Sequence, residues 1–395
     1  MEFELWYLIL VPILFGAGWY AHSFDQKEKK STSDETKTLY RGLDLLLSNK
    51  KDQAIDSFIN LVKTDPDTIE MHYSLGALFR RRGEFDRAIR IHNHLANRGD
   101  LPKKEHNRAI FELGEDYLKA GLWDRAEATF VKLTEKESSY QALAARKLIF
   151  IYESEKEWQK AIHVAQMLEK ISSEMMPSRI GHLYCELAEQ CLHRGKAEEA
   201  VSYINEALKV DSHHKRALFM LGNLQEKSGK LAEAVETWLR LGEINPDYET
   251  LVVSRIANGL IALGDKERAL QYLTHIVEKG KNIDELDAAV QVISKVKSPE
   301  EAIELIQKRL EKRPSLMGFQ RLLELSQANE PENKQIAELS RLLKQQVDKV
   351  ARYQCTKCGF ATTRFQWLCP GCRQWESMPP IRSEKVVARS QKTNI

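Results

Sequence analysis

Four cysteines near the carboxyl end of the chain have the spacing of a metal site. Cys355 and Cys358 form one C-x2-C pair. After ten intervening residues, Cys369 and Cys372 form a second pair. Two such pairs supply the four thiolates of a closed tetrahedral site, which zinc and iron both accept. The spacing therefore predicts one zinc or iron ion held by these four sulfurs.

The sequence around the pairs indicates how such a site is built. The stretches CTKCGF and CPGC are similar to the two metal-binding loops of rubredoxin, but the interval between them is far shorter than in electron-carrying rubredoxins. The shortening favours a small zinc-ribbon-like module over residues 351–380, with an iron-based redox carrier as the alternative. Its apolar bulk is aromatic: Phe360, Phe365, Trp367 and Trp375. Because so few apolar residues cannot hold a fold alone, we expect removal of the ion to unfold the module.

Further potential ligands occur earlier in the chain: His182, Cys185, Cys191 and His193. A second metal site is one interpretation. Cys191, however, takes a repeat position that a packed apolar side chain normally fills, which favours buried structural cysteines. His213 and His214 fall at a predicted turn between repeats, where we expect them to be solvated.

The elements that must position these residues are predicted to be helices. The 395 residues include only 11 prolines and 19 glycines, and 29% of them are charged. This composition is typical of an all-α protein. The length exceeds one ordinary core and indicates several domains or a repeat array. Lysine and arginine number 59 against 57 acidic residues, so the whole chain has no strong field for nucleic acid.

An apolar segment near the amino end predicts a membrane anchor. Residues 5–21 carry no charge and would span about 25 Å as a helix. Basic residues follow the segment and none precedes it, which predicts that the bulk of the chain lies on the cytoplasmic side. We therefore expect a single-pass transmembrane anchor over residues 1–24 and a polar linker over residues 25–35. The small residues at 16–18 would let another membrane helix approach closely, and a homo-oligomer is one alternative.

A repeat follows the linker. Alanines recur at intervals of 34 to 39 residues: Ala54, Ala88, Ala126, Ala161, Ala200, Ala234 and Ala269. The surrounding pattern resembles the tetratricopeptide repeat, which is a pair of antiparallel helices about 34 residues long. We predict about nine repeats over residues 36–347, and the last two, around Ala302 and Ala337, are degenerate.

Glycines and prolines mark the expected helices of each repeat. Glycines in first helices are predicted to allow close packing on the small alanine of the second helix: Gly42, Gly76, Gly114 and Gly222. Glycines between helices are predicted to take the left-handed conformation: Gly83, Gly121, Gly195, Gly229 and Gly264. Prolines are expected just after second helices: Pro66, Pro246 and Pro314.

Stacked repeats of this kind form a superhelix whose concave face is lined by the first helix of each repeat. Such faces bind peptides and proteins. Four basic residues fall at positions expected to face inward: Arg80, Arg81, Lys119 and Lys227. They predict a basic stretch suited to acidic segments or carboxylates, and ordinary solvated charge is the alternative for each of them.

The chain is expected to end in a basic tail over residues 381–395. Some zinc ribbons use such charge to bind nucleic acid. No RNA-stacking motif accompanies this tail, and a membrane-anchored array gives nucleic acid no obvious approach. We therefore expect no nucleic-acid partner; anionic lipid or solvent would surround the tail instead.

The anchor, the repeats and the closing module together resemble the lipopolysaccharide assembly protein B family of Gram-negative bacteria. The most specific stretch is residues 353–380, YQCTKCGFATTRFQWLCPGCRQWESMPP. The resemblance implies an inner-membrane adaptor that helps a membrane AAA+ protease degrade the deacetylase that commits precursor to lipid A. It also implies contact between the span and a membrane signalling protein, and packing of the metal module on the repeats. The four cysteines carry over as ligands.

Two other functions compete with the protease adaptor. A scaffold would gather lipopolysaccharide-synthesis enzymes at the inner membrane without controlling proteolysis. A redox carrier would use iron in the four-sulfur site. Catalysis is not expected, because the sequence holds no nucleophile elbow, phosphate loop or zinc-hydrolase motif, and four cysteine ligands leave no open coordination position.

Overall fold

The computed structural model describes residues 69–135, 138–279, 283–312, 314–329, 332–347 and 351–381, with a few isolated positions between 15 and 57. The predicted transmembrane anchor, the linker, most of the first repeat and residues 382–395 lie outside these ranges, as do Gly42 and Pro66. Among the helices that are described, none has the length and apolar run needed to cross a membrane.

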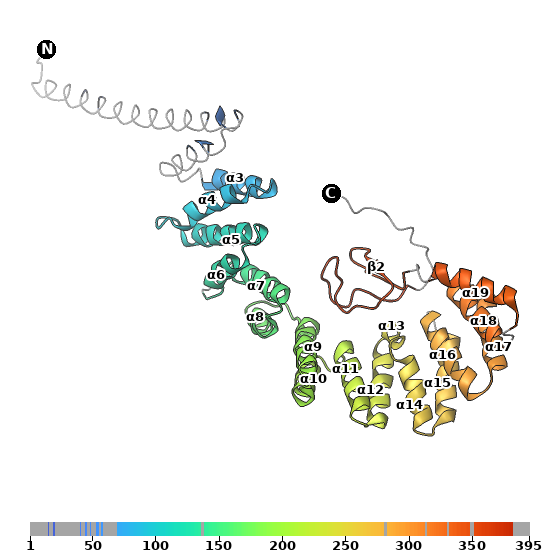
Figure 1. Cartoon of the computed structure of the whole chain (residues 1–395). Helices are drawn as coiled ribbons and strands as arrows, with labels where there is room; N and C mark the ends of the chain where they lie inside the picture. The colour runs from blue at the N-terminus through green and yellow to red at the C-terminus, as the bar shows by residue number, and fades with distance from the viewer. Residues whose placement is uncertain are drawn as a thin grey trace, which may run out of the picture. The chain divides into compact units, whose positions relative to one another are not determined.

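The described chain is helical up to its last module, as the sequence predicts (Figure 1). The helices are α3 (Ile69–Arg81), α4 (Phe85–Ala96), α5 (Lys103–Lys119), α6 (Trp123–Thr134), α7 (Gln141–Glu155), α8 (Trp158–Ile171), α9 (Pro177–His193), α10 (Ala197–Val210), α11 (Lys215–Lys227), α12 (Leu231–Ile244), α13 (Pro246–Glu249), α14 (Val253–Ala262), α15 (Lys266–Lys279), α16 (Ile283–Val296), α17 (Pro299–Lys312), α18 (Leu316–Asn329) and α19 (Lys334–Val347). Pro246 and Pro314 follow α12 and α17, as expected.

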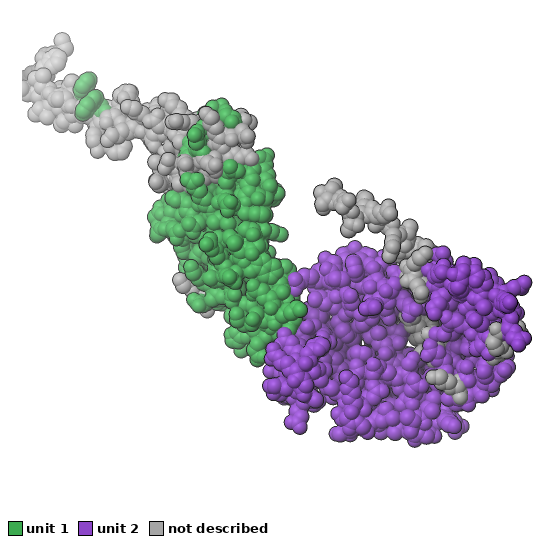
Figure 2. Space-filling view, in the orientation of Figure 1, with its two compact units in different colours: residues 1–174 green, residues 175–395 purple. Residues whose placement is uncertain are grey.

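Successive helices pack in pairs, as tetratricopeptide repeats require. The pairs are α3 with α4, α5 with α6, α7 with α8, α9 with α10, α11 with α12, α14 with α15, α16 with α17, and α18 with α19. All seven alanines that define the sequence period are buried. The chain divides into two compact units, residues 1–174 and residues 175–395, which are coloured separately in Figure 2. The metal module belongs to the second unit.

Glycines in the first helices allow close packing, and the atoms nearest to Gly114 and Gly222 belong to aromatic rings of the second helix. A Cβ atom on Gly114 would lie 2.6 Å from the ring of Phe130, and one on Gly222 would lie 2.3 Å from the ring of Trp238. Each ring stands four residues after the repeat alanine and so on the same face of the second helix. Because glycine has no side chain, the ring from the second helix occupies the space that a Cβ atom would take.

The five loop glycines have positive φ angles between 75° and 88°, which confirms their predicted left-handed conformation: Gly83, Gly121, Gly195, Gly229 and Gly264. This backbone region excludes most side chains but accepts glycine without strain. Each glycine ends the first helix of a pair and lets the chain turn into the second.

Residues 351–381 form a small module with little regular structure. Two short strands pair antiparallel, β1 (Tyr353–Gln354) and β2 (Ala361–Thr362). A further bridge joins Leu368 to Trp375. The apolar core of the module consists of four buried residues, with Phe365 packed against them: Tyr353, Cys355, Cys369 and Met378. Since two of these are predicted metal ligands, the module has almost no apolar core without an ion.

Candidate functional site: a metal centre packed on the repeats

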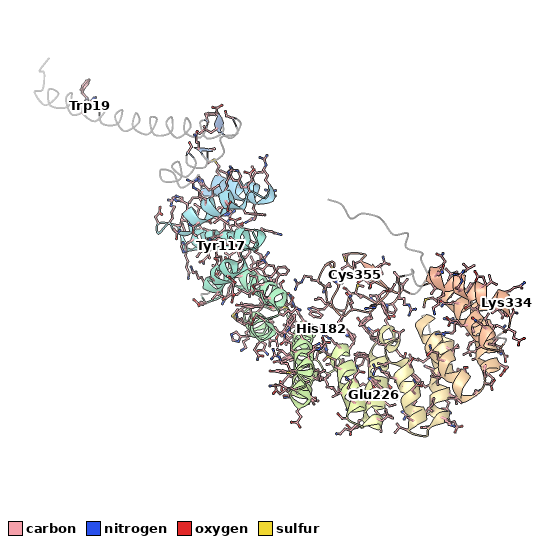
Figure 3. All side chains as sticks on the ribbon, in the orientation of Figure 1. Trp19, Tyr117, His182, Glu226, Lys334 and Cys355 are labelled. Atoms are coloured by element: carbon pink, nitrogen blue, oxygen red, sulfur yellow. The ribbon has the colours of Figure 1, made fainter. Side chains whose placement is uncertain are left out.

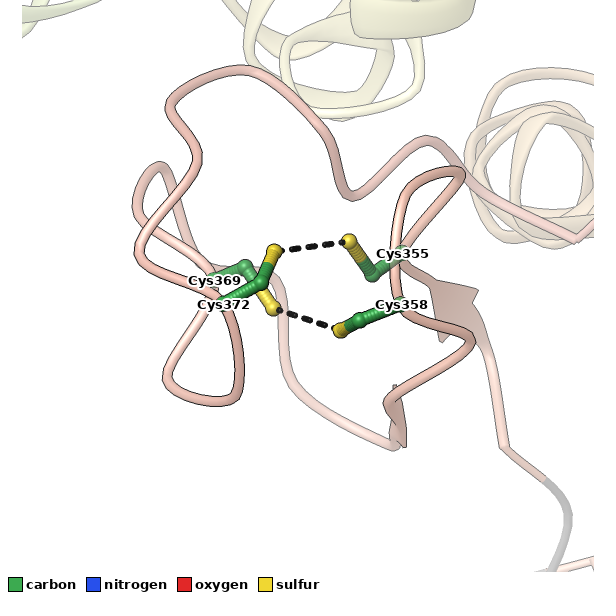
Figure 4. A group of neighbouring side chains, drawn as sticks. All are labelled: Cys355, Cys358, Cys369 and Cys372. Atoms are coloured by element: carbon green, nitrogen blue, oxygen red, sulfur yellow. Dashed lines mark hydrogen bonds between the residues drawn. The ribbon is translucent and has the colours of Figure 1, made fainter. Parts of the chain in front are cut away.

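The four cysteines of the module converge on one point (Figure 4). All four Sγ atoms lie within 4.8 Å of one another. The distance is 3.6 Å between Cys355 and Cys372, and again 3.6 Å between Cys358 and Cys369. Sulfurs about 2.3 Å from a tetrahedral ion would stand about 3.8 Å apart. The quartet therefore already has the spacing that one bound ion requires, and the predicted metal site is confirmed.

Two similar loops hold the sulfurs. In the first loop, the Gly359 amide donates to the Cys355 carbonyl (3.0 Å) and Gly359 has φ 77°. In the second, the Arg373 amide donates to the Cys369 carbonyl (2.8 Å) and Arg373 has φ 58°. Each loop thus closes with a left-handed residue directly after its second cysteine. Glycine takes this conformation freely, whereas Arg373 takes it at some cost in strain.

Hydrogen bonds prepare one sulfur for the metal. Burial raises the pKa of the Cys355 thiol, but hydrogen bonding with the Ser377 hydroxyl and with the amides of Cys358 and Lys357 outweighs burial and lowers that pKa to about 6. The Lys357 amide lies 3.4 Å from the sulfur. A thiolate is the form of cysteine that binds metal, so Cys355 is close to its ligand state at neutral pH.

Cys372 behaves in the opposite way. The Gln374 amide lowers the pKa of Cys372, but burial and hydrogen bonds with the other three sulfurs raise it to about 12. Four thiolates this close repel one another unless a cation lies between them. The donor set therefore fits a bound zinc or iron ion, which would neutralise the sulfurs and link the two loops.

The exposed sulfurs are Cys358 and Cys372, while Cys355 and Cys369 are buried. One side of the site is thus open to solvent and gives an ion a route of entry. The four sulfurs occupy all positions of a tetrahedral ion, so the site is built to hold a metal rather than to activate a substrate on it.

The module packs on the repeats through its aromatic residues. Trp367 stacks on Tyr248 of α13, with ring centroids 5.3 Å apart and an angle of 6° between the planes. Phe365 meets Tyr248 edge on, at 5.8 Å and 88°. Phe219 of α11 lies 6.2 Å from Trp367. Both module rings lie against the apolar core around Trp238 in the repeats.

These contacts correct one sequence expectation. The aromatic residues of the module do not all lie in its internal core, because a segment of about thirty residues is too thin to enclose several large rings; Phe365 does contribute to that core, with its ring 5.4 Å from that of Tyr353. Phe365 and Trp367 are covered by α11 and α13, and Trp375 stacks on His182 of α9 at 4.5 Å. Phe360 remains 39% exposed.

A charged residue completes the contact. The Glu376 carboxylate lies 2.5 Å from Nζ of Lys215 on α11 and 3.3 Å from Nε2 of His182 on α9. The Tyr248 hydroxyl donates to the Glu376 carbonyl at 3.4 Å. Burial raises the pKa of Glu376, but its hydrogen bonds with His182 and Lys215 hold the pKa at about 2. Glu376 is therefore charged at neutral pH and paired with Lys215.

We call the surface formed by His182, Lys215, Phe219 and Tyr248 the docking face. It combines side chains of α9, α11 and α13 within the second unit. His182 on α9 faces the module that carries Cys355 (Figure 3). The sequence analysis named His182 only as a potential metal ligand and did not single out the other three residues.

His214 is buried, so the expectation that it is solvated was wrong; His213 is exposed. Nδ1 of His214 accepts the Ala217 amide (3.2 Å) and caps the amino end of α11. Its Nε2 lies 3.1 Å from the Ser178 carbonyl and donates to it. Because both ring nitrogens form hydrogen bonds with backbone groups, the ring can be buried although the turn that carries it lies at the surface. Burial, followed by the neighbouring His182, lowers the pKa of His214 to about 3.

Polar atoms of His182, His214 and Glu376 lie within 4.8 Å of one another, which is a possible second metal arrangement. Both nitrogens of His214 already have backbone partners, and Lys215 holds one carboxylate oxygen. A cation would have to displace these partners beside an existing ammonium group. The cluster is therefore better explained as the contact between module and repeats.

Cys185 and Cys191 are buried, as the structural interpretation predicts, and His193 is exposed. Burial raises the pKa of the Cys185 thiol to about 12, so this side chain is neutral. Both cysteines pack in the apolar core between α9, α10 and α11.

The four basic residues predicted for the partner groove differ in surroundings. Arg80 on α3 is held by Glu112 (2.6 Å) and Asp116 (2.9 Å) of α5. This pairing ties two successive first helices together. The other three residues are exposed to solvent: Arg81, Lys119 and Lys227. Their contact with a partner stays a prediction.

Family models match both parts of this architecture. The rubredoxin metal binding domain matches residues 353–380, and the tetratricopeptide repeat matches residues 40–93 and 192–254. The fold and the site thus define a tetratricopeptide-repeat protein closed by a rubredoxin-type metal module. Lipopolysaccharide assembly protein B of Escherichia coli strain K12 is 34% identical over 386 residues, covering 96% of this chain and 98% of that protein. The chain belongs to the lipopolysaccharide assembly protein B family.

A second relative agrees with this assignment. Lipopolysaccharide assembly protein B of Haemophilus influenzae is 30% identical over 400 residues, covering 97% of this chain and 99% of that protein. Among solved structures, the TPR2AB domain complex of yeast Sti1 aligns with 70% of this chain and 98% of that chain, at 19% identity. Its TM-score of 0.33 is too low to support a common arrangement of repeats.

Proposed function

We propose that this protein is a non-catalytic adaptor at the cell inner membrane that restrains lipopolysaccharide synthesis. In this proposal it presents the deacetylase that commits precursor to lipid A to a membrane AAA+ protease. The observation that carries the proposal is the 34% identity to lipopolysaccharide assembly protein B along 96% of the chain.

The architecture supports an adaptor in preference to an enzyme. Tetratricopeptide helices present faces that bind other polypeptides. The four-sulfur site supplies no open coordination position for a substrate. Its ion would instead stabilise a module that lies on α9, α11 and α13, and so would help to fix the arrangement of the repeats that contain these helices.

The membrane location is supported by sequence. Residues 5–21 lie outside the described ranges, but they carry no charge and are long enough to span a bilayer. Basic residues after the segment favour a cytoplasmic position for the repeats. A cytoplasmic array would meet a protease and a client on the same side of the membrane.

The test is the half-life of the deacetylase in cells after protein synthesis is stopped. Deletion of residues 1–24, or the double substitution Cys355→Ser and Cys358→Ser, should lengthen that half-life. Cys191→Ser is the matched control, since it alters a buried cysteine outside the metal site. The proposal is refuted if both variants accumulate to normal levels and leave deacetylase turnover unchanged.

A scaffold for lipopolysaccharide-synthesis enzymes is the second candidate, which the word "assembly" in the names of the relatives favours. Cross-linking in living cells separates the two. An adaptor should be captured with the protease and the deacetylase, whereas a scaffold should be captured with several synthesis enzymes and little protease.

A further inference from the structure

The docking face has the chemistry of a peptide-binding surface. Tyr248 and Phe219 offer ring faces, Lys215 offers a cation, and His182 offers a further ring, on which Trp375 stacks. Two of the contributing helices, α9 and α11, are the first helices of their repeats and so belong to the side that usually receives ligands. Within the second unit, Figure 1 draws the module on the inner side of the arc from α9 to α19.

The module fills this surface with one short stretch of chain. Phe365, Trp367, Trp375 and Glu376 all fall within residues 365–376. Trp367 stacks on Tyr248, Trp375 stacks on His182, and the Glu376 carboxylate pairs with Lys215. Aromatic anchors beside one charge pair are the contacts by which short segments gain most of their binding energy. The stretch thus occupies the face as a peptide ligand would.

The bound ion controls the shape of that stretch. Cys369 and Cys372 lie between the two tryptophans in sequence. The Glu376 amide donates to the Trp367 carbonyl at 2.9 Å, so the metal loop brings Trp367 and Glu376 together. Without an ion the loop loses the link between its two halves, and ordering the stretch for docking then costs conformational entropy.

We propose that the docking face is a binding site for segments of other proteins that carry aromatic side chains next to a carboxylate, and that the metal-loaded module blocks it as an internal ligand. Loss of the ion frees the face. This proposal does not depend on the protease or on the deacetylase, so it can fail while the adaptor function stands.

A labelled peptide tests the proposal. The probe is a fluorescein-labelled peptide of residues 363–378 with serine in place of Cys369 and Cys372. Its binding to the full-length chain is measured by fluorescence anisotropy. The ion-free variant Cys355→Ser/Cys358→Ser should bind the peptide at least tenfold more tightly than the metal-loaded chain, because its tethered module, no longer ordered by the ion, competes for the face less strongly.

Matched substitutions show whether the peptide uses the docking face. On the ion-free background, Tyr248→Ala and Lys215→Gln should each weaken binding at least fivefold. Lys209→Gln should have no effect, because Lys209 is an exposed residue whose partner is Glu206 on its own helix. Equal binding by the metal-loaded and ion-free chains would overturn the proposal. So would the absence of binding to the ion-free chain, or binding that ignores Tyr248→Ala.

Two further measurements cover the case in which the ion-free variant does not fold and the case in which a second copy of the chain occupies the face. If the ion-free variant loses helical circular dichroism, the variant Trp367→Ala/Glu376→Gln is used, since it keeps all four cysteines and its metal content can be measured. It should bind the peptide more tightly than the wild type, and failure to do so overturns the proposal. Light scattering tests a second copy as occupant: a dimer of ion-free chains that Glu376→Gln abolishes would show that the face takes the module of another copy, which contradicts the proposed partner.

Discussion

The carboxylate of Glu376 lies 2.5 Å from the ammonium group of Lys215, although 161 residues separate them in the chain. Their side chains are only 16% and 21% exposed. This ion pair joins the second metal loop to α11 and thereby couples the metal site to the repeats. Because both groups are largely shielded from water, either one alone would be an unfavourable charge.

Glu376→Gln should lower the free energy of unfolding of the second unit by about 1–3 kcal/mol, since it leaves the Lys215 charge without its carboxylate. The metal content should not change. Glu206→Gln is the control, because Glu206 pairs with Lys209 at an exposed position and should shift stability by no more than about 0.5 kcal/mol. Denaturant titration of both variants makes the comparison, and equal effects would contradict the coupling.

The purified chain should contain one metal ion, which Cys358→Ser/Cys372→Ser should remove. Elemental analysis measures the content, and absorbance identifies the metal. A colourless zinc site agrees with a structural module. A coloured iron site that bleaches reversibly on reduction would support the redox carrier instead.

Gly222→Ala should destabilise the repeats by about 1–3 kcal/mol, because the added Cβ would lie 2.3 Å from the ring of Trp238. Gly99→Ala is the matched control, since nothing lies within 4 Å of its Cβ position. Its effect should stay within about 0.5 kcal/mol. Thermal unfolding followed by circular dichroism compares them. A tolerated Gly222→Ala would argue against this packing.

Arg80→Ala should cost about 1–3 kcal/mol, because it removes a cation from the fully buried carboxylate of Asp116, whose other oxygen lies 2.5 Å from Nδ1 of His92. Arg81→Ala, on the exposed side of the same helix, should change stability by no more than about 0.5 kcal/mol. The pair of denaturation curves tests whether Arg80 is a structural residue. If Arg80→Ala does not change stability, the guanidinium of Arg80 is not needed for the fold and would be available to bind a partner.

Acid should destabilise the second unit through His182, His214 and Glu376, since the pKa of each is lowered in the folded chain. His214 has its pKa lowered from 6.5 to about 3, so the unfolded chain takes up the proton first, and stability falls as pH drops from about 6.5 toward 3. Each such group contributes a slope of about 1.4 kcal/mol per pH unit. Glu376, with its pKa lowered from 4.5 to about 2, adds a loss between those values.

His214→Asn should reduce the pH dependence of unfolding between pH 7 and pH 5, since asparagine can still cap α11 but does not titrate. Denaturation midpoints at the two pH values, for wild type and variant, provide the measurement. An unchanged difference between the two pH values would exclude His214 as the source.

Local patterns in the sequence predicted the metal ligands and the repeats well. Spacing alone identifies three features, because each is defined by residues close together in the sequence: the C-x2-C pairs, the repeat alanines and the loop glycines. The ring partners of Gly114 and Gly222 were missed, because the pattern marks the small residue and not the large one that fills its space. Arg373 was missed because a left-handed arginine has no sequence signal.

The docking face could not be predicted for a different reason. Lys215, Tyr248 and Glu376 are ordinary residues until folding brings together segments more than a hundred residues apart. The burial of His214 was missed for the same reason, since its ring contacts the Ser178 carbonyl of α9, which lies 36 residues earlier in the chain. Only the acidic residue directly after Trp375, in an otherwise basic stretch, hinted that the module carries a charged contact.

Hydrogen–deuterium exchange of the full-length chain, with and without its ion, tests the central claim that four sulfurs hold an ion that keeps the module on the repeats. Removal of the ion should speed exchange in residues 351–381 and in α13, while α3 to α6 of the first unit exchange as before. An ion-free chain in which residues 351–381 and α13 exchange as slowly as in the loaded chain would contradict the account.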